Sequence, residues 1–147
     1  MISVEVKKMN VHAEIPQYMT LGSAGCDIKA CLSEPLEIKP LERKAVPTGL
    51  AFGIPEGFEI QVRPRSGLSI KQGLTVINAP GTIDSDYRGE VMILVVNLGN
   101  ETVKLQHGDR VAQLVLQKVN QIGWQEVTQL SDTARGAGGF GSTGLRN

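Results

Sequence analysis

Turn-forming clusters divide this chain into many short extended segments, and their spacing limits the possible folds more than any other feature. The 17 glycines and 7 prolines help to mark turns such as 98–100 and 107–109. These signals recur roughly every 8–12 residues, which is typical of β-sandwiches and barrels. Apolar residues also alternate with polar ones, for example at Phe58, Ile60 and Val62. The sequence therefore predicts an all-β domain.

Three local patterns refine this prediction. Residues 91–97 form a nearly continuous apolar run, which predicts a strand buried on both faces. One short helix is expected from Ser66, as its N-cap, to Gly73, where a glycine can end it. A Pro80-Gly81 turn between two extended segments predicts a hairpin over residues 74–83.

Residues 131–147 differ in composition from the β domain expected over residues 1–130. Five of the ten residues from 135 to 144 are glycine, so this stretch buries too little apolar surface to order itself. Arg135 and Phe140 stand among these glycines, a combination that suits a flexible arm closing over a ligand. A frayed chain end is the alternative. The G-x-G-x-x-G pattern at 136–141 does not indicate a dinucleotide site, because no strand precedes it closely and no helix can follow.

Charge and residue types argue against several functional classes. The 15 basic and 15 acidic residues cancel, so no excess of positive charge favours nucleic acid, whose binding needs a basic face or stripe. No apolar stretch approaches the length that spans a membrane, and the N-terminus does not resemble a secretory signal. Cys26 and Cys31 match no zinc template and are expected to be reduced, which indicates a cytoplasmic protein. His12 and His107 accompany no nucleophile motif. The sequence also offers no cage of His and Cys ligands, so any metal is expected to be a hard, oxygen-bound ion such as Mg²⁺ on phosphates.

Three polar positions outside the turn 78–90 are candidates for binding. In the segment 64–67, an arginine, a hydroxyl and a glycine at a helix start favour an anion site, with a solvated surface turn as the alternative. Gln113 is polar within an apolar strand and faces away from its neighbours. Asp27 begins a strand, where it could support a metal-bound water or form a structural ion pair.

Residues 78–90 are the most informative segment. Backbone groups at the end of a hairpin can pair with the edge of a planar base. Asp84 can hold a water as a general base or orienter, and Tyr87 offers a flat face for a sugar. A charged turn between core strands is the alternative interpretation.

Together these segments resemble the trimeric dUTPase family, whose five motifs appear here in order. The motifs are AGCDIKA at 24–30, PRSGLS at 64–69, NAPGTIDSDYRGE at 78–90, GDRVAQLVL at 108–116 and RGAGGFGSTG at 135–144. They span nearly the whole chain, and the third is long and idiosyncratic, so the resemblance is specific. Small departures at Cys26 and Ser69 affect no residue with an assigned role.

The resemblance implies a jelly-roll-like distorted barrel of the dUTPase β-clip type, with one short helix and a flexible glycine-rich C-terminal arm. It also implies a homotrimer with shared active sites, each built from three chains, in which the arm of one subunit closes over a pocket formed by others. The implied reaction is Mg²⁺-assisted attack of water on the α-phosphorus of dUTP, which gives dUMP and pyrophosphate. That reaction limits uracil incorporation into DNA and supplies dUMP for thymidylate synthesis.

By the same resemblance, the hairpin over residues 78–92 holds the nucleoside. The residues expected near the pyrimidine are Asn78, Thr82, Ile83 and Met92, with the Asn78 amide and backbone groups near Met92 reading its edge. Asp84 is the expected catalytic residue, which bonds the 3′-hydroxyl and orients the attacking water. Tyr87 is expected to pack on deoxyribose and leave no room for a 2′-hydroxyl.

The remaining roles implied by the resemblance concern the phosphates and the arm. The other substrate-binding residues are Arg65, Ser66, Gly67, Gln113, Arg135, Phe140, Gly141, Ser142 and Thr143. Among these, Phe140 is expected to stack over uracil, and Arg135 to reach the γ-phosphate. Asp27 is expected to support Mg²⁺ indirectly, through water. Cations around a triphosphate neutralise its charge and let water approach phosphorus.

Several alternatives stay open at this stage. A dCTP deaminase shares the fold but needs a different catalytic carboxylate and hairpin, and a bifunctional enzyme is disfavoured for the same reason. A nucleotide-sensing regulator would use the dUTP site as a switch for a protein partner, although no extra domain or insertion offers a surface for one. A purely structural trimer is disfavoured by Asp84, Arg135 and Phe140.

Overall fold

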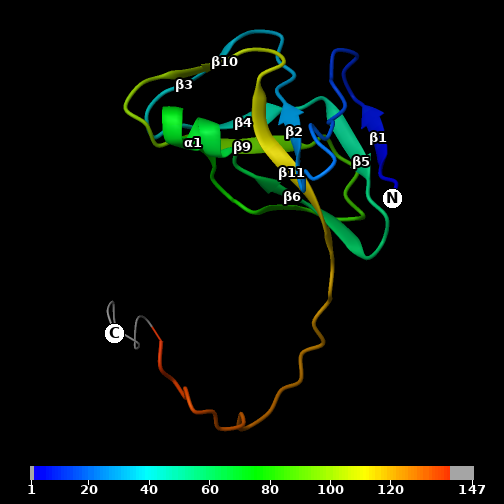
Figure 1. Cartoon of the computed structure of the whole chain (residues 1–147), viewed down its shortest axis with the longest axis vertical. Helices are drawn as coiled ribbons and strands as arrows, with labels where there is room; N and C mark the ends of the chain where they lie inside the picture. The colour runs from blue at the N-terminus through cyan, green and yellow to red at the C-terminus, as the bar shows by residue number, and fades with distance from the viewer. Residues whose placement is uncertain (1, 140–147) are drawn as a thin grey trace.

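Short antiparallel strands make up nearly all of the regular structure (Figure 1). The computed structural model describes residues 2–139. Within that range the strands are β1 (Glu5–Lys8), β2 (Cys26–Lys29), β3 (Leu36–Ile38), β4 (Arg43–Pro47), β5 (Leu50–Gly53), β6 (Phe58–Arg63), β7 (Leu74–Val76), β8 (Gly81–Ile83), β9 (Met92–Asn97), β10 (Val103–Leu105) and β11 (Arg110–Lys118). The one helix in the same range is α1 (Ser66–Gln72). The prediction of an all-β chain with one short helix is therefore confirmed.

The strands form two sheets and two paired ribbons around a common core. One sheet has the order β2-β11-β6-β8 and the other β4-β9-β7, while β1 pairs with β5 and β3 with β10. Aliphatic side chains from both sheets, such as Ile28, Val62 and Ile93, are each no more than 6% exposed. Since only 4% of the residues are aromatic, branched aliphatic side chains fill this core, and they pack well on the pleated surface of strands.

The apolar run at 91–97 forms β9, but the prediction that this strand is buried on both faces is wrong. Met92 and Leu94 are 39% and 41% exposed, whereas Ile93 and Val95 are buried. Successive side chains of a strand point to opposite faces, and only one face of the β4-β9-β7 sheet packs on the core. The exposed face lines the pocket described in the next section.

The predicted hairpin over residues 74–83 is also wrong in its pairing. β7 pairs with β9, with Val76 opposite Val95, whereas β8 pairs with β6, with Gly81 opposite Val62. The turn between β7 and β8 contains a cis Ala79–Pro80 peptide bond and crosses from one sheet to the other. Each strand is stabilised more by extending a larger sheet, because an isolated pair of short strands is only marginally stable.

Helix α1 ends where the sequence predicts and begins one residue away. Gly73 has a φ of 68°, and its N–H donates to the Ser69 carbonyl at 3.1 Å, so this glycine terminates the helix. Ser66 is the first helical residue rather than the N-cap, a position that Arg65 takes without a side-chain cap hydrogen bond. Within residues 2–139, no helix has the length and apolar character needed to cross a bilayer.

After β11 the chain leaves the sheets along an extended path, which Figure 1 shows in orange to red. Residues 119–139 contain no strand or helix. Their large apolar side chains face solvent, and Trp124 and Leu130 are 89% and 87% exposed. A stretch that leaves such side chains uncovered lacks a packing partner within the described part of its own chain.

Candidate functional site

A pocket of about 280 Å³ opens beside β8 and β9. It is called the nucleoside pocket below, after the group that the resemblance implies there. Its lining residues are Val62, Asn78, Gly81, Thr82, Ile83, Asp84, Tyr87, Glu90, Val91, Met92 and Leu94. The structure thus brings together six of the residues that the sequence predicts near the nucleoside, namely Asn78, Thr82, Ile83, Asp84, Tyr87 and Met92. Phe140, which is expected to stack over uracil, lies outside the described residues. The volume is near the lower end for small-molecule sites, roughly 300 Å³.

Local hydrogen bonds fix the turn that carries Asp84 and Tyr87. The Tyr87 N–H donates to the Asp84 carbonyl at 3.2 Å, and the Tyr87 hydroxyl donates to the Glu90 carbonyl at 3.0 Å. A Cβ added at Gly89 would lie 2.4 Å from the Tyr87 hydroxyl, so the ring passes closely over this glycine. Asp84 is exposed, which leaves its carboxylate open to water beside the pocket. This arrangement can orient a water against a bound nucleotide.

A second group of residues, named here the anion cluster, consists of Asp27, Arg65, Arg110 and Gln113. Asp27 Oδ1 accepts from Arg65 Nε at 2.9 Å, and Asp27 Oδ2 accepts from Arg110 Nη1 at 3.2 Å. Arg65 Nη1 also donates to the Arg110 carbonyl at 3.2 Å. Two guanidinium groups share one carboxylate, so the cluster keeps a net positive charge. Such a fixed cationic group suits the binding of phosphate oxygens.

Gln113 positions the backbone that leads to Arg65. It lies on β11 directly opposite Asp27 of β2, and its Nε2 donates to the Pro64 carbonyl at 2.9 Å. A Cβ added at Gly25 would lie 2.7 Å from Gln113 Oε1, so the glycine there leaves room for the amide. Gln113 therefore fixes the turn before Arg65, in addition to the phosphate contact that the resemblance implies for it.

Within one chain, the nucleoside pocket and the anion cluster lie at opposite corners of the four-stranded sheet. Ile83 lies opposite Ile60 on β6, so Asp84 follows near the start of β6, whereas Arg65 follows its end. Asp84 is level with Glu59, and β6 ends at Arg63, so these two levels are roughly 13 Å apart along the strand. Asp27 on β2 is three strand positions away from β8, roughly 14 Å across the sheet. The pocket lining includes no member of the anion cluster.

The other predicted site residues fall on exposed segments or outside the described range. Ser66 and Gly67 are exposed in the first turn of α1, next to Arg65. Arg135 is exposed, and its Nε donates to the Gly138 carbonyl at 2.7 Å. Neither the nucleoside pocket nor the anion cluster includes Arg135 in this chain. The remaining predicted residues, Phe140, Gly141, Ser142 and Thr143, lie outside the described residues.

Sequence reasoning missed two side chains that the structure joins to these groups. Arg110 belongs to the segment GDRVAQLVL, but an arginine after a turn is ordinarily solvated, so nothing local singled it out. Glu90 ends the segment NAPGTIDSDYRGE, and its Oε1 accepts from the Gly49 N–H at 2.8 Å. This partner is 41 residues away in the sequence, so no spacing pattern could indicate it.

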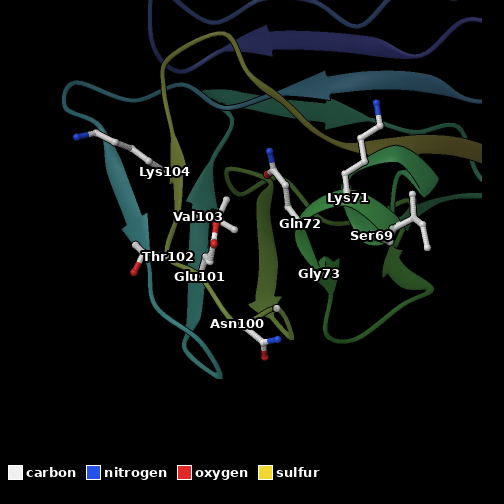
Figure 2. A pocket seen from close by; sticks show the side chains of 11 residues that line it. Ser69, Lys71, Gln72, Gly73, Asn100, Glu101, Thr102, Val103 and Lys104 are labelled. Atoms are coloured by element: carbon white, nitrogen blue, oxygen red, sulfur yellow. The ribbon is translucent and has the colours of Figure 1, made fainter.

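A larger hollow of about 650 Å³ lies between the end of α1 and the turn after β9 (Figure 2). It contains none of the predicted site residues. Figure 2 shows the side chains of Lys71 and Lys104 extending away from each other, so they do not converge on a common anion. The candidate site is therefore the nucleoside pocket, whose lining combines a carboxylate, an amide and an aromatic ring.

The donor set bears on metal binding. In residues 2–139, no three His, Cys, Asp or Glu side chains gather as a metal site. Asp27 is the acidic member of the anion cluster, and both of its oxygens already accept from arginines. These residues fit a divalent cation that is carried mainly by phosphate oxygens and touches the protein through water.

The sequence matches the family model described as dUTPase over residues 11–144. A deoxyuridine 5′-triphosphate nucleotidohydrolase from Bdellovibrio bacteriovorus is 57% identical over 144 residues, which cover 97% of each chain. The enzyme of the same name from Desulfotalea psychrophila is 59% identical over 131 residues, covering 89% of this chain and 87% of the other.

Solved structures are also similar to this chain. A dUTPase of Staphylococcus bacteriophage 80alpha, determined with dUpNHpp, superposes with a TM-score of 0.88 at 26% identity, covering 97% of this chain and 99% of that chain. That phage protein is described as controlling the transfer of virulence genes. A dUTPase variant from phage phi11 of S. aureus, described with a structural Mg(II) ion, has a TM-score of 0.80 at 24% identity, covering 88% of this chain and 99% of that chain.

Proposed function

Because this chain belongs to the dUTPase family, we propose that it hydrolyses dUTP to dUMP and pyrophosphate. The family and the dUTPase-like fold predicted from the sequence are both confirmed by the matches above. The observation that carries the proposal is the nucleoside pocket, which places an exposed carboxylate, Asp84, beside an aromatic wall, Tyr87. The reaction limits uracil incorporation into DNA and supplies dUMP for thymidylate synthesis.

The nucleoside pocket selects the substrate in this proposal. The Asn78 amide and the backbone near Met92 bind the pyrimidine edge, so cytosine presents mismatched donors and acceptors. A pocket with little spare volume also resists the 5-methyl group of dTTP, although a methyl alone contributes only about 1–3 kcal/mol of discrimination. Tyr87 packs against the deoxyribose and excludes a 2′-hydroxyl.

Asp84 acts on the water. Its carboxylate accepts a hydrogen bond from the 3′-hydroxyl and holds the attacking water in line with the α-phosphorus. Water then displaces pyrophosphate, so the bond that forms joins water oxygen to the α-phosphorus and the bond that breaks joins that phosphorus to the bridging oxygen. Holding the water in line contributes as much as the basicity of the carboxylate, because a water already in place avoids the entropy cost of bringing it to the phosphorus from bulk solvent.

The anion cluster grips the phosphates. Asp27 and the Arg110 carbonyl hold the Arg65 guanidinium in place, and its remaining N–H groups are directed to phosphate oxygens. Ser66 and Gly67 follow in the exposed first turn of α1 and offer a hydroxyl and backbone N–H groups. Fixed donors of this kind stabilise charge that develops during phosphoryl chemistry.

Mg²⁺ is part of the proposal because the donor set suits a cation carried by the triphosphate. Asp27 is the residue that supports its waters, and the ion, when bound, offsets phosphate charge and favours the leaving pyrophosphate. The two arginines beside Asp27 then determine how close the phosphates come to the protein.

A homotrimer with shared active sites is part of the proposal, and the separation of the two groups within one chain supports it. Asp84 must hold water at the α-phosphorus while Arg65 binds phosphate of the same nucleotide, yet they lie at opposite corners of one sheet. A second chain can supply the missing half. The exposed apolar residues of the C-terminal segment, Ile122, Trp124, Val127 and Leu130, support an assembly that covers them. Residues 131–147 then close over the site of another chain, with Arg135 at the γ-phosphate.

A cytoplasmic location is proposed from the cysteines. Cys26 and Cys31 are both free thiols. Burial raises the pKa of each thiol, for Cys31 with a smaller effect from the nearby Glu90 carboxylate. A raised pKa keeps a thiol protonated and unreactive, which suits a protein that works in a reducing compartment.

Pyrophosphate release from dUTP with Mg²⁺ tests the proposal, with dCTP, dTTP and UTP as alternative substrates. Asp84→Asn removes the carboxylate and is expected to lower kcat by roughly 10²–10⁴-fold. Asp86→Asn is the matched control, because Asp86 is exposed in the same turn but does not line the pocket. Ammonia release from dCTP would instead indicate a deaminase, and tight dUTP binding without turnover would indicate a nucleotide-sensing regulator.

A further inference from the structure

The turn between β4 and β5 lies behind the nucleoside pocket and is bonded to its wall. Thr48 is 1% exposed and does not line the pocket. Its hydroxyl donates to the Val91 carbonyl at 2.7 Å and accepts from the Leu50 N–H at 3.3 Å. The Val91 N–H donates in turn to the Leu50 carbonyl at 2.8 Å. These bonds tie the residue before β9 to the buried turn.

Gly49 adds a second connection at the same place. Its N–H donates to Glu90 Oε1 at 2.8 Å, and its carbonyl accepts from the Met9 N–H at 2.7 Å. Gly49 has a φ of 66°, and an added Cβ would lie 2.8 Å from Ala13 Cβ. Since only glycine adopts this conformation without strain in so little space, the turn has a single backbone path.

The Tyr87 ring is held by the same stretch of pocket wall that the buried turn holds. The Tyr87 hydroxyl donates to the Glu90 carbonyl, so the ring is anchored to the Glu90–Val91 peptide, whose N–H donates to the Leu50 carbonyl next to the buried turn. Gly89 lies beneath the ring and leaves it in close contact with the backbone. The position of the ring therefore depends on the position of the Glu90–Val91 peptide. The Leu50 carbonyl holds the N–H of that peptide, and Thr48 holds the carbonyl that follows it, that of Val91.

We infer that Thr48 is a positioning residue for nucleoside selection: by holding the Val91 carbonyl it fixes the backbone at Glu90 and Val91, which sets the Tyr87 ring and with it the exclusion of ribonucleotides. The inference rests on the proposed function, which assigns Tyr87 to the sugar. A steric filter against one hydroxyl requires accurate placement, because a displacement of about 1 Å can change rates by roughly 10²-fold. Thr48 touches no substrate in this account and acts only through the peptide it holds.

Thr48→Val tests the inference, because valine keeps the shape of threonine and removes the hydroxyl. The ratio of kcat/KM for dUTP to kcat/KM for UTP is expected to fall roughly tenfold, the scale of one lost hydrogen bond. The loss is expected mainly as a raised KM for dUTP and a raised Kd for dUMP, with kcat changed less. Thr48→Ser keeps the hydroxyl and is expected to retain the wild-type ratio. Thr102→Val, an exposed threonine in another turn, is the matched control.

Glu90→Ala provides a second route if Thr48→Val does not fold, because it removes the bond to the Gly49 N–H and keeps both bonds of the Thr48 hydroxyl. It is expected to lower the same ratio. Glu90→Gln, which keeps an oxygen for that bond and still lines the pocket, is its control and is expected to retain the wild-type ratio. A folded Thr48→Val protein with an unchanged ratio, or an equal loss in Thr48→Ser, overturns the inference, as does an unchanged ratio in Glu90→Ala. If the wild-type protein does not hydrolyse dUTP, the proposed function fails instead, so the two failures are distinguishable.

Discussion

Residues 78–92 and residues 119–139 both carry side chains expected at the substrate, yet the structure holds the two segments in opposite ways. Residues 78–92 are bonded to the rest of the β domain, here called the body, through the β8–β6 pairing and through the contacts of Thr48 and Gly49 in the buried turn. In the second, the hydrogen bonds of the described residues beyond Val119 join only positions within 133–138.

The difference indicates that the two segments have different roles, one in choosing the substrate and the other in closing over it. A segment with many fixed contacts can present a pocket before any ligand binds, so it suits discrimination between similar bases. A segment with few contacts to its own chain orders only against a ligand or another chain, so it suits closing over the phosphates. Selectivity and turnover are thus expected to respond differently to changes in the two segments.

Deleting residues 131–147 is expected to have the largest effect. Turnover of dUTP, as kcat/KM, is expected to fall by roughly 10²–10³-fold, because the proposed function assigns Arg135 of the arm to the γ-phosphate. The affinity for dUMP, measured by calorimetry, is expected to fall by less than about tenfold, the scale of one lost aromatic contact. An equal loss in kcat/KM and in dUMP affinity would contradict the different roles of the two segments.

Asn97→Ala tests the fixed side of the comparison. The buried Asn97 amide donates to the Ile38 and Glu101 carbonyls at 2.8 Å each, and its oxygen accepts from the Gly99 N–H at 2.8 Å. Urea denaturation is expected to show a loss of about 2–4 kcal/mol, because three partners are left without it. Asn120→Ala, in the exposed segment, is the matched control and is expected to change stability by less than about 0.5 kcal/mol. Equal effects would contradict the assignment of rigidity to the body.

Gln113→Ala has the smallest expected effect and refines the comparison inside the body. The variant frees the Pro64 carbonyl and loosens the turn before Arg65, so kcat/KM for dUTP is expected to fall roughly tenfold. Gln117→Ala, on the same face of β11, is the control and is expected to leave turnover unchanged. The ratio of dUTP to UTP turnover serves as a second readout, and a change in that ratio would show that the anion cluster also controls the sugar.

The sequence predicted the strands well wherever local pattern governs them. Alternation at Phe58, Ile60 and Val62 predicted β6, and the glycine at 73 predicted the end of α1, because both features depend on neighbours in the chain. The pairing of β7 and β8 was beyond local pattern, since each strand bonds to a partner from a different sheet. The exposed face of β9 was missed for the same reason: an apolar run does not reveal which side lacks cover.

The site follows the same rule. Asn78, Asp84 and Tyr87 occupy one motif, so a short segment predicted that they lie together, and the structure places them in one pocket. Arg110 and Thr48 join the site or its support through contacts 83 and 43 residues apart in the sequence. Such contacts exist only after the sheets form, so neither residue could be identified from spacing.

The central claim is that one active site needs two chains, and mixing two inactive variants tests it most directly. Asp84→Asn disables the nucleoside pocket and Arg65→Ala disables the anion cluster. Each is expected to be inactive alone. After co-refolding in equal amounts, pyrophosphate release is expected to recover to about a quarter of the wild-type rate, because random assembly pairs an intact pocket with an intact cluster in about one site of four. No recovery, from a mixture that contains both variants in each assembly, would contradict the claim and place the whole site within a single chain.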